Sequence, residues 1–121
     1  MSKKILVVED TEDNRRILHD LFSAAGYDMI EAHDGAEGVA KASEHRPDLI
    51  LMDIQMPVMD GYEATRRIKA DPVLKSIPVI AVTSYALSGD EDKARAAGCD
   101  GYVAKPFSPR QMLAKVREII G

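Results

Sequence analysis

The sequence predicts a doubly wound α/β fold, in which helices cover both faces of one parallel sheet of about five strands. Short apolar runs alternate along the chain with amphipathic stretches. Two of the runs, residues 5–8 and 49–52, are continuously apolar, as expected of strands that are buried on both faces. The 121 residues suffice for one domain with a buried core, spanning residues 1–121.

Each predicted element follows from its own pattern. The first strand, 5–8, precedes a helix that Gly26 would cap. The inward positions of that helix are Ile17, Leu18, Leu21, Phe22 and Ala25. Residues 28–32 alternate between apolar and polar, which predicts an edge strand. A second helix begins near Asp34, with Ala36, Val39 and Ala40 predicted to face inward.

The second half of the chain repeats this alternation. Strand 49–52 precedes a helix that follows Asp60, with Ala64 and Ile68 facing inward. Strand 79–82 precedes a helix over 88–97, which Gly98 would end. A short strand, 102–104, leads to the last helix. Its apolar positions are Met112, Leu113, Val116, Ile119 and Ile120.

Four helix starts have a capping residue followed three positions later by Glu or Gln. The pairs are Asp34 with Glu37, Asp60 with Glu63, Ser88 with Glu91, and Ser108 with Gln111. Such pairs satisfy backbone amides that the first helical turn leaves without partners. They therefore support the predicted helix boundaries.

Composition excludes several classes of protein. A hydrophobic content of 45% argues against disorder, and a net charge of −4 does not favour binding to DNA or to an anionic membrane. The single cysteine, Cys99, excludes an internal disulfide and a zinc site built from several cysteines. No apolar run could span a bilayer, and the N-terminus lacks a signal-peptide pattern. A cytoplasmic location is expected.

Polar side chains stand where the predicted strands end. The first strand ends in Glu9 and Asp10, the third in Asp53, the fourth in Thr83 and the fifth in Lys105. If the strand order is 2-1-3-4-5, the first and third strands flank the point where that order reverses, which is where such folds bind ligands. We therefore expect the three carboxylates to converge there.

The converging charges predict a metal site. Three carboxylates and one lysine sum to −3 + 1 = −2, which a divalent cation would neutralise. Hard oxygen ligands favour Mg²⁺, for which Mn²⁺ can substitute. A metal beside a carboxylate, a hydroxyl and a lysine suits phosphoryl transfer, in which a carboxylate can itself be the nucleophile and form an acyl phosphate.

Four stretches match a known family. They are residues 5–10 (ILVVED), 47–61 (PDLILMDIQMPVMDG), 82–84 (VTS) and 105–107 (KPF). In this order and spacing, the chain resembles the receiver domain of two-component response regulators, the CheY-like group. The resemblance covers residues 4–120 and implies a flavodoxin-like sheet of order 2-1-3-4-5.

The resemblance assigns a role to each site residue. Asp53 would be the phosphoacceptor, and Asp10, Glu9 and the backbone carbonyl of Gln55 would complete the metal site. Thr83 and Lys105 would bind phosphoryl oxygens. Three further positions are assigned: a cis peptide bond at Pro106, a switch aromatic at Tyr102, and tuning positions at Gln55 and Tyr85. The bulk of Tyr85 is expected to slow hydrolysis of the phosphoryl group.

The resemblance also implies partners. A histidine kinase or a histidine phosphotransfer protein would supply the phosphoryl group, and the chain would catalyse only its own phosphorylation and dephosphorylation. The face of the fourth helix, fifth strand and fifth helix would bind a target protein or a second copy of the chain. Because no further domain follows residue 121, DNA binding by this chain is not expected.

Alternative functions remain open at this point. The same module serves in hybrid kinases and as a relay carrier, and a scaffold that has lost phosphorylation is a further alternative. An aspartyl-nucleophile phosphatase would need a second acid two residues after the nucleophile, where this chain has Gln55. A flavodoxin-like electron carrier would need a phosphate-binding loop after the first strand, where residues 11–14 contain no glycine.

Overall fold

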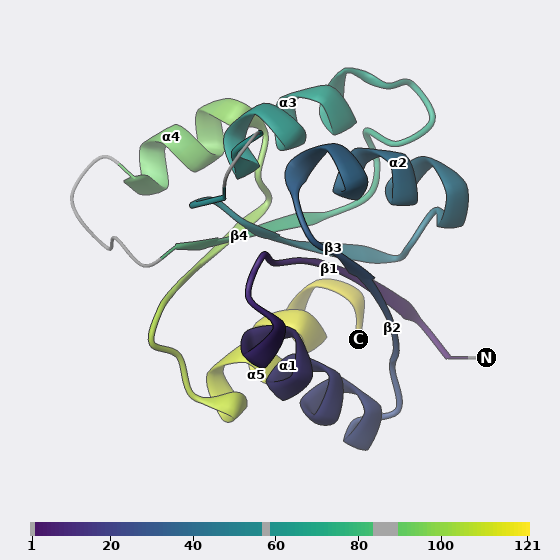
Figure 1. The fold of residues 1–121 in the computed structure, drawn as a ribbon, viewed down its shortest axis with the longest axis vertical. Helices are drawn as coiled ribbons and strands as arrows, with labels where there is room; N and C mark the ends of the chain where they lie inside the picture. The colour runs from purple at the N-terminus through teal and green to yellow at the C-terminus, as the bar shows by residue number, and fades with distance from the viewer. Residues whose placement is uncertain (1, 57–58, 84–89) are drawn as a thin grey trace.

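The computed structural model of the protein describes residues 2–56, 59–83 and 90–121. In this part of the chain, five parallel strands form one sheet in the order β2-β1-β3-β4-β5 (Figure 1). The strands are β1 (Lys4–Val8), β2 (Asp28–Ala32), β3 (Leu49–Asp53), β4 (Val79–Thr83) and β5 (Gly101–Ala104). The helices are α1 (Glu12–Ala24), α2 (Gly35–His45), α3 (Gly61–Ala70), α4 (Asp90–Ala97) and α5 (Pro109–Ile120). The predicted fold and strand order are confirmed.

The helices form two layers around the sheet. Helices α1 and α5 cover one face, and α2, α3 and α4 cover the other (Figure 1). Alternate residues of β1 supply the two cores: Ile5 and Val7 pack with α1 and α5, whereas Leu6 and Val8 pack on the opposite side. This alternation follows from the two-residue repeat of a strand. Because helices cover both of their faces, the central strands are apolar up to their carboxyl ends, where the polar residues begin.

The predicted capping pairs stabilise three of the helix starts. The side chain of Asp34 accepts a hydrogen bond from the amide of Glu37, and Asp60 accepts one from the amide of Glu63. Ser108 and Gln111 form a reciprocal capping box. The predicted cap at Ser88 lies outside the described residues.

Some of the predicted inward positions are wrong. Ile17 is 58% exposed, and Ala36 and Ala40 are exposed, while Gly35, Gly38 and Ala42 form the buried face of α2. A Cβ atom added at Gly38 would lie 2.8 Å from Cγ2 of Val8. The glycine face therefore lets α2 approach β1 closely, and the apolar pattern of small alanines could not reveal this.

Candidate functional site

The strand order brings the acidic residues together at one edge of the sheet. β1 and β3 are neighbours, with Val8 paired to Met52, so that Glu9 and Asp10 follow β1 beside Asp53 at the end of β3. Each of the three residues offers one carboxylate oxygen, and these three oxygens lie within 4.8 Å of one another. Glu9 and Asp53 are buried, at 3% and 5% exposed, whereas Asp10 is exposed.

This arrangement fits a hard divalent cation. Each of the three carboxylates offers an oxygen, the donor type that Mg²⁺ and Mn²⁺ prefer. Two of the carboxylates are taken out of water by burial, so their mutual repulsion is poorly screened. The exposed Asp10 leaves the group open to solvent, as an ion that keeps several water ligands requires.

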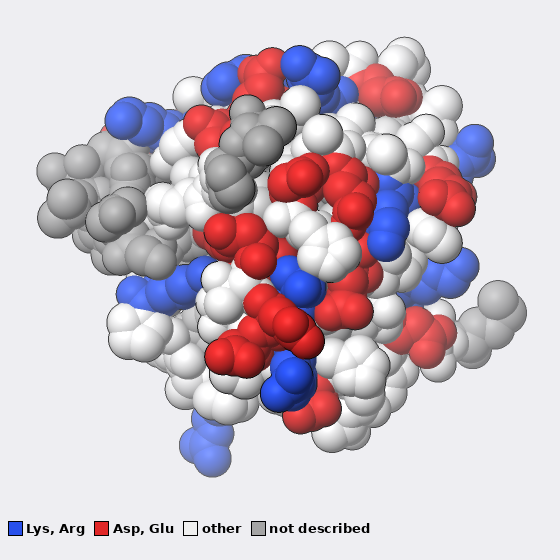
Figure 2. All heavy atoms as spheres, in the orientation of Figure 1, with Lys and Arg blue, Asp and Glu red and all other residues white. Residues whose placement is uncertain are grey.

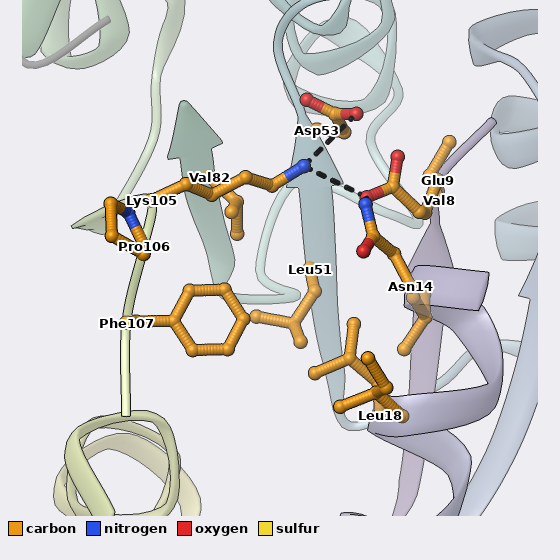
Figure 3. Close-up of a pocket in the computed structure, with 12 residues that line it drawn as sticks. Val8, Glu9, Asn14, Leu18, Leu51, Asp53, Val82, Lys105, Pro106 and Phe107 are labelled. Atoms are coloured by element: carbon orange, nitrogen blue, oxygen red, sulfur yellow. Dashed lines mark hydrogen bonds and ion pairs between the residues drawn. The ribbon is translucent and has the colours of Figure 1, made fainter. Parts of the chain in front are cut away.

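The ammonium group of Lys105 lies among the buried acids. Its Nζ atom is 2.8 Å from Oε1 of Glu9 and 3.6 Å from Oδ2 of Asp53 (Figure 3). The peptide bond between Lys105 and Pro106 is cis. These contacts place the only positive charge among the predicted site residues between the two buried carboxyl groups, which raises the pKa of Lys105 above its ordinary value despite its partial burial.

Burial and neighbouring groups shift the pKa values of the two buried carboxyl groups, Asp53 and Glu9, in opposite directions. Burial, together with the adjacent Glu9 carboxylate, raises the pKa of Asp53 to about 8. Burial also opposes the charge on Glu9, but hydrogen bonds from Asp53 and Lys105 outweigh it and lower the pKa of Glu9 to about 2. Burial and the nearby Glu9 raise the pKa of Asp10 as well. Without a cation, Asp53 therefore holds a proton more strongly than Glu9 does.

Gln55 connects the acidic group to Thr83. Its backbone amide donates to Oδ1 of Asp53 at 3.2 Å, and its side-chain amide donates to the Thr83 hydroxyl at 2.7 Å. Thr83 is completely buried as the last residue of β4. The structure therefore brings the predicted hydroxyl, ammonium and carboxyl groups to one end of the sheet.

The start of α3 lies close to the main chain of Asp53 and Ile54 at the end of β3. The amide of Gly61 donates to the carbonyl of Ile54 at 3.1 Å. A Cβ atom added at Gly61 would lie only 2.4 Å from the main-chain oxygen of Asp53. The absence of a side chain at this position is therefore what lets the start of α3 reach the end of β3.

Known proteins resemble this chain in sequence and in structure. Residues 5–117 match the family model of the response regulator receiver domain. The chain belongs to this family. It is 45% identical over 121 residues to the polar-differentiation response regulator DivK of Brucella anthropi, covering 100% of this chain and 98% of that protein. This receiver domain therefore has close relatives that are named response regulators.

Solved structures agree with this assignment. The Vibrio cholerae chemotaxis protein CheY4 superposes on this receiver domain with a TM-score of 0.93 at 30% identity, covering 98% of this chain and 99% of that one. The receiver domain of a sensor histidine kinase from Pseudomonas aeruginosa gives a TM-score of 0.92 at 37% identity, covering 100% and 99%. That structure has a magnesium ion coordinated in its active-site cleft.

Two site residues of this receiver domain were missed by sequence reasoning. Asn14 donates from its side-chain amide to Oε1 of Glu9 at 2.9 Å, and Arg15 donates to the main-chain oxygen of Glu9 at 2.8 Å. Arg15 is 8% exposed and also lies 3.5 Å from Glu31. A signal was available for Arg15, because it stands three residues before Leu18 and seven before Phe22 on the apolar stripe of α1.

Two further positions were predicted to act in this site, Tyr102 and Tyr85. Tyr102 is partly buried on β5 and packs against a small cluster formed by Ile54, Ala81 and Ala94. Tyr85 lies outside the described residues. The role predicted for each of them stays a prediction.

An apolar cavity adjoins the charged group of the receiver domain. It has a volume of about 550 Å³, and Lys105 and Asn14 line it next to Leu18, Leu51 and Phe107 (Figure 3). Lys105 is partly exposed and extends over this space. The side chain of Lys105 therefore borders this open space.

The surroundings of the site are acidic. Figure 2 shows many acidic side chains gathered on the face viewed, with basic side chains between them. The exposed acids Asp10, Glu12 and Asp13 follow β1 directly. An acidic surface of this kind attracts cations from solution.

Among the described residues, no helix has an apolar stretch long enough to be a transmembrane helix.

Proposed function

We propose that the chain is a phosphorylation-dependent signalling switch of a two-component or phosphorelay system. The observation that carries this proposal is the buried Asp53 carboxyl beside Glu9, within 3.6 Å of the ammonium of Lys105. A buried acid held next to one cation and two further carboxylates is strained in the absence of a ligand. A bound divalent cation would relieve this imbalance and allow the site to accept an anionic phosphoryl group.

Asp53 is the proposed nucleophile. An ionised carboxylate oxygen attacks the phosphorus of a phosphohistidine, the P–N bond breaks, and the imidazole leaves with the electron pair and takes up a proton. A bound Mg²⁺ would neutralise the carboxylates and the phosphoryl oxygens and so favour the ionised form of Asp53. Glu9, Asp10 and the carbonyl of Gln55 are the proposed companions of Asp53 in holding it.

Lys105 and Thr83 are proposed to bind the phosphoryl oxygens once the group is attached. The added charge of about −1.5 to −2 attracts the ammonium of Lys105. The hydroxyl of Thr83 donates a charge-assisted hydrogen bond to a phosphoryl oxygen. Thr83 would then move relative to Gln55, and Tyr102 would turn inward as the switch aromatic. Tyr85 is proposed to slow loss of the phosphoryl group, so that a Tyr85→Ala variant should dephosphorylate faster.

The proposed partners follow from the family. A histidine kinase or a histidine phosphotransfer protein donates the phosphoryl group, and the chain turns over no external substrate. The face of α4, β5 and α5 is the proposed output surface. It carries the basic residues Lys93, Arg95, Arg110, Lys115 and Arg117. A target protein or, after phosphorylation, a second copy of the chain would bind there in the cytoplasm.

A role as the receiver module of a hybrid kinase is a second candidate. The likeness to the receiver domain of a sensor histidine kinase, at 37% identity, favours it. The chemistry at Asp53 is the same in both cases, so one experiment tests the shared core.

The test is phosphorylation by a small donor. The protein is incubated with Mg²⁺ and acetyl phosphate, and its intact mass is followed. We expect the mass of one phosphoryl group to be added to the wild type, and no addition with Asp53→Asn or with a chelator. A wild-type protein that stays unlabelled under these conditions would contradict the proposal.

A further inference from the structure

The carboxylate of Glu9 is held by more donors than Lys105 alone. Its Oε2 atom accepts a hydrogen bond from the backbone amide of Asp10 at 3.0 Å. Its Oε1 atom accepts one from Lys105 at 2.8 Å and another from the side-chain amide of Asn14 at 2.9 Å. At 3% exposure, Glu9 has little access to water, so these protein donors supply most of its hydrogen bonds.

Lys105 serves two acids at once. It is closer to Glu9, at 2.8 Å, than to Asp53, at 3.6 Å. In the proposed function, which this inference presupposes, Lys105 moves toward a phosphoryl oxygen on Asp53. Oε1 of Glu9 then loses one of the two donors described above, and a buried oxygen left without a donor is destabilising.

We propose that Asn14 is the positioning residue that releases Lys105 for phosphoryl binding. Its amide keeps Oε1 of Glu9 paired both before and after Lys105 moves. Glu9 therefore stays in place while the ammonium changes partner. The cavity beside Lys105 and Asn14 gives the lysine side chain space for that change.

The position of Asn14 suits this role. It lies in the first turn of α1, and the next residue, Arg15, donates to the main-chain oxygen of Glu9 at 2.8 Å. Two consecutive helical residues thus hold the side chain and the backbone of Glu9. A neutral amide also donates without adding charge, whereas an acid there would repel Glu9 and hold Lys105 more tightly.

The experiment separates this role from a structural one. The full chain is prepared as the wild type, Asn14→Leu, Asn14→Asp and Asn14→Gln. Asn14→Leu removes the donor at similar volume, Asn14→Asp keeps the shape without the donor, and Asn14→Gln keeps an amide. Ser23→Ala is the control, because Ser23 is a neutral, exposed residue near the other end of the same helix. Each protein is labelled with acetyl phosphate and titrated with Mg²⁺ alone.

We expect the labelling rate and the Mg²⁺ affinity to respond differently to these substitutions. The labelling rate should fall by about tenfold or more in Asn14→Leu and Asn14→Asp, the cost of one hydrogen bond to a charged group. The dissociation constant for Mg²⁺ should change by less than about threefold in Asn14→Leu, since Lys105 still pairs with Glu9 before phosphorylation. Asn14→Gln should recover most of the rate, and Ser23→Ala should match the wild type.

A spectroscopic measurement provides a second readout. The side-chain amide protons of Asn14 should exchange slowly with solvent in both the free and the phosphorylated wild type, as observed in ¹⁵N spectra.

The inference fails if Asn14→Leu and Asn14→Asp are labelled at the wild-type rate, or if labelling, Mg²⁺ affinity and thermal stability all decline in parallel. If Asn14→Leu does not fold, the isosteric Asn14→Asp decides. Failure of the wild type itself to be labelled would instead overturn the proposed function.

Discussion

Lys105 and Glu9 form an ion pair at the carboxyl edge of the sheet, with 2.8 Å between Nζ and Oε1. Both side chains are shielded from water, at 21% and 4% exposed. The pair joins the end of β5 to the end of β1, two strands that are not neighbours in the sheet. The pair therefore acts as a cross-link over the site as well as a source of charge neutralisation.

Replacing Lys105 by methionine should destabilise the metal-free protein. Two buried carboxyl groups would lose their cation, and we expect the free energy of unfolding to fall by about 1–3 kcal/mol near neutral pH, less than for a fully buried pair because Lys105 is partly exposed. Saturating Mg²⁺ should reduce this loss, since the ion then neutralises the same carboxylates. Urea unfolding followed by circular dichroism, with chelator and with Mg²⁺, measures both values. Equal stability of Lys105→Met and wild type in chelator would contradict the expectation.

The stability of the metal-free protein should fall as pH rises through the neutral range. Asp53 has a pKa of about 8 in the folded protein against an ordinary value of 3.8. Between these values the folded state holds a proton that the unfolded state has released, so the free energy of unfolding decreases with rising pH. Glu9, with its pKa lowered to about 2 from 4.5, contributes stability that is lost only as pH falls below about 4.5.

Asp53→Asn is the control for this pH dependence. The variant cannot ionise at this position, so its stability should change less with pH. It should resemble the wild type near pH 6 and exceed it near pH 9, because the wild type then carries a buried charge. Denaturant unfolding in chelator across this range gives the two slopes. Parallel slopes for the two proteins would exclude Asp53 as the titrating group.

Mg²⁺ affinity should increase with pH over the same interval. In the proposed function the ion binds the ionised form of Asp53, so binding displaces a proton at any pH below about 8. The apparent association constant should rise by up to about tenfold per pH unit in that region and level off above it. Calorimetric titrations in two buffers with different ionisation enthalpies count the protons released. An affinity that is constant between pH 6 and 8 would rule out this competition.

The polar residues at the strand ends were predictable from the sequence, whereas the α1 residues that hydrogen-bond to Glu9 were not. Glu9, Asp10 and Asp53 end apolar runs, and parallel topology requires the carboxyl ends of neighbouring strands to share one edge. The place of Arg15 on the apolar stripe of α1 indicates that it is buried, but not what it contacts. The contacts of Asn14 and Arg15 with Glu9 depend on the direction in which α1 leaves the sheet, which no periodicity encodes. The buried face of α2 was mispredicted for a related reason, since contact between Gly38 and Val8 is a property of the packed pair.

Gly61→Ala should disturb the site through the backbone of Asp53. The added Cβ would lie 2.4 Å from the main-chain oxygen of Asp53 and 2.8 Å from Cα of Ile54, and rigid main-chain atoms cannot move aside cheaply. We expect a loss of about 2–4 kcal/mol in stability, in the upper range for overpacking. Labelling by acetyl phosphate should also slow, because the clash moves the carboxylate relative to Lys105.

Gly26→Ala is the matched control for Gly61→Ala. Gly26 has a φ of 89°, and a Cβ there would meet nothing within 4 Å. Its substitution should therefore cost only about 1–2 kcal/mol of left-handed backbone strain and leave the labelling rate of the folded protein unchanged. If both alanine variants lost stability equally and were labelled at the wild-type rate, the close approach of α3 to β3 would not be what positions Asp53. A selective loss of labelling in Gly61→Ala links the carboxylate geometry to the start of α3.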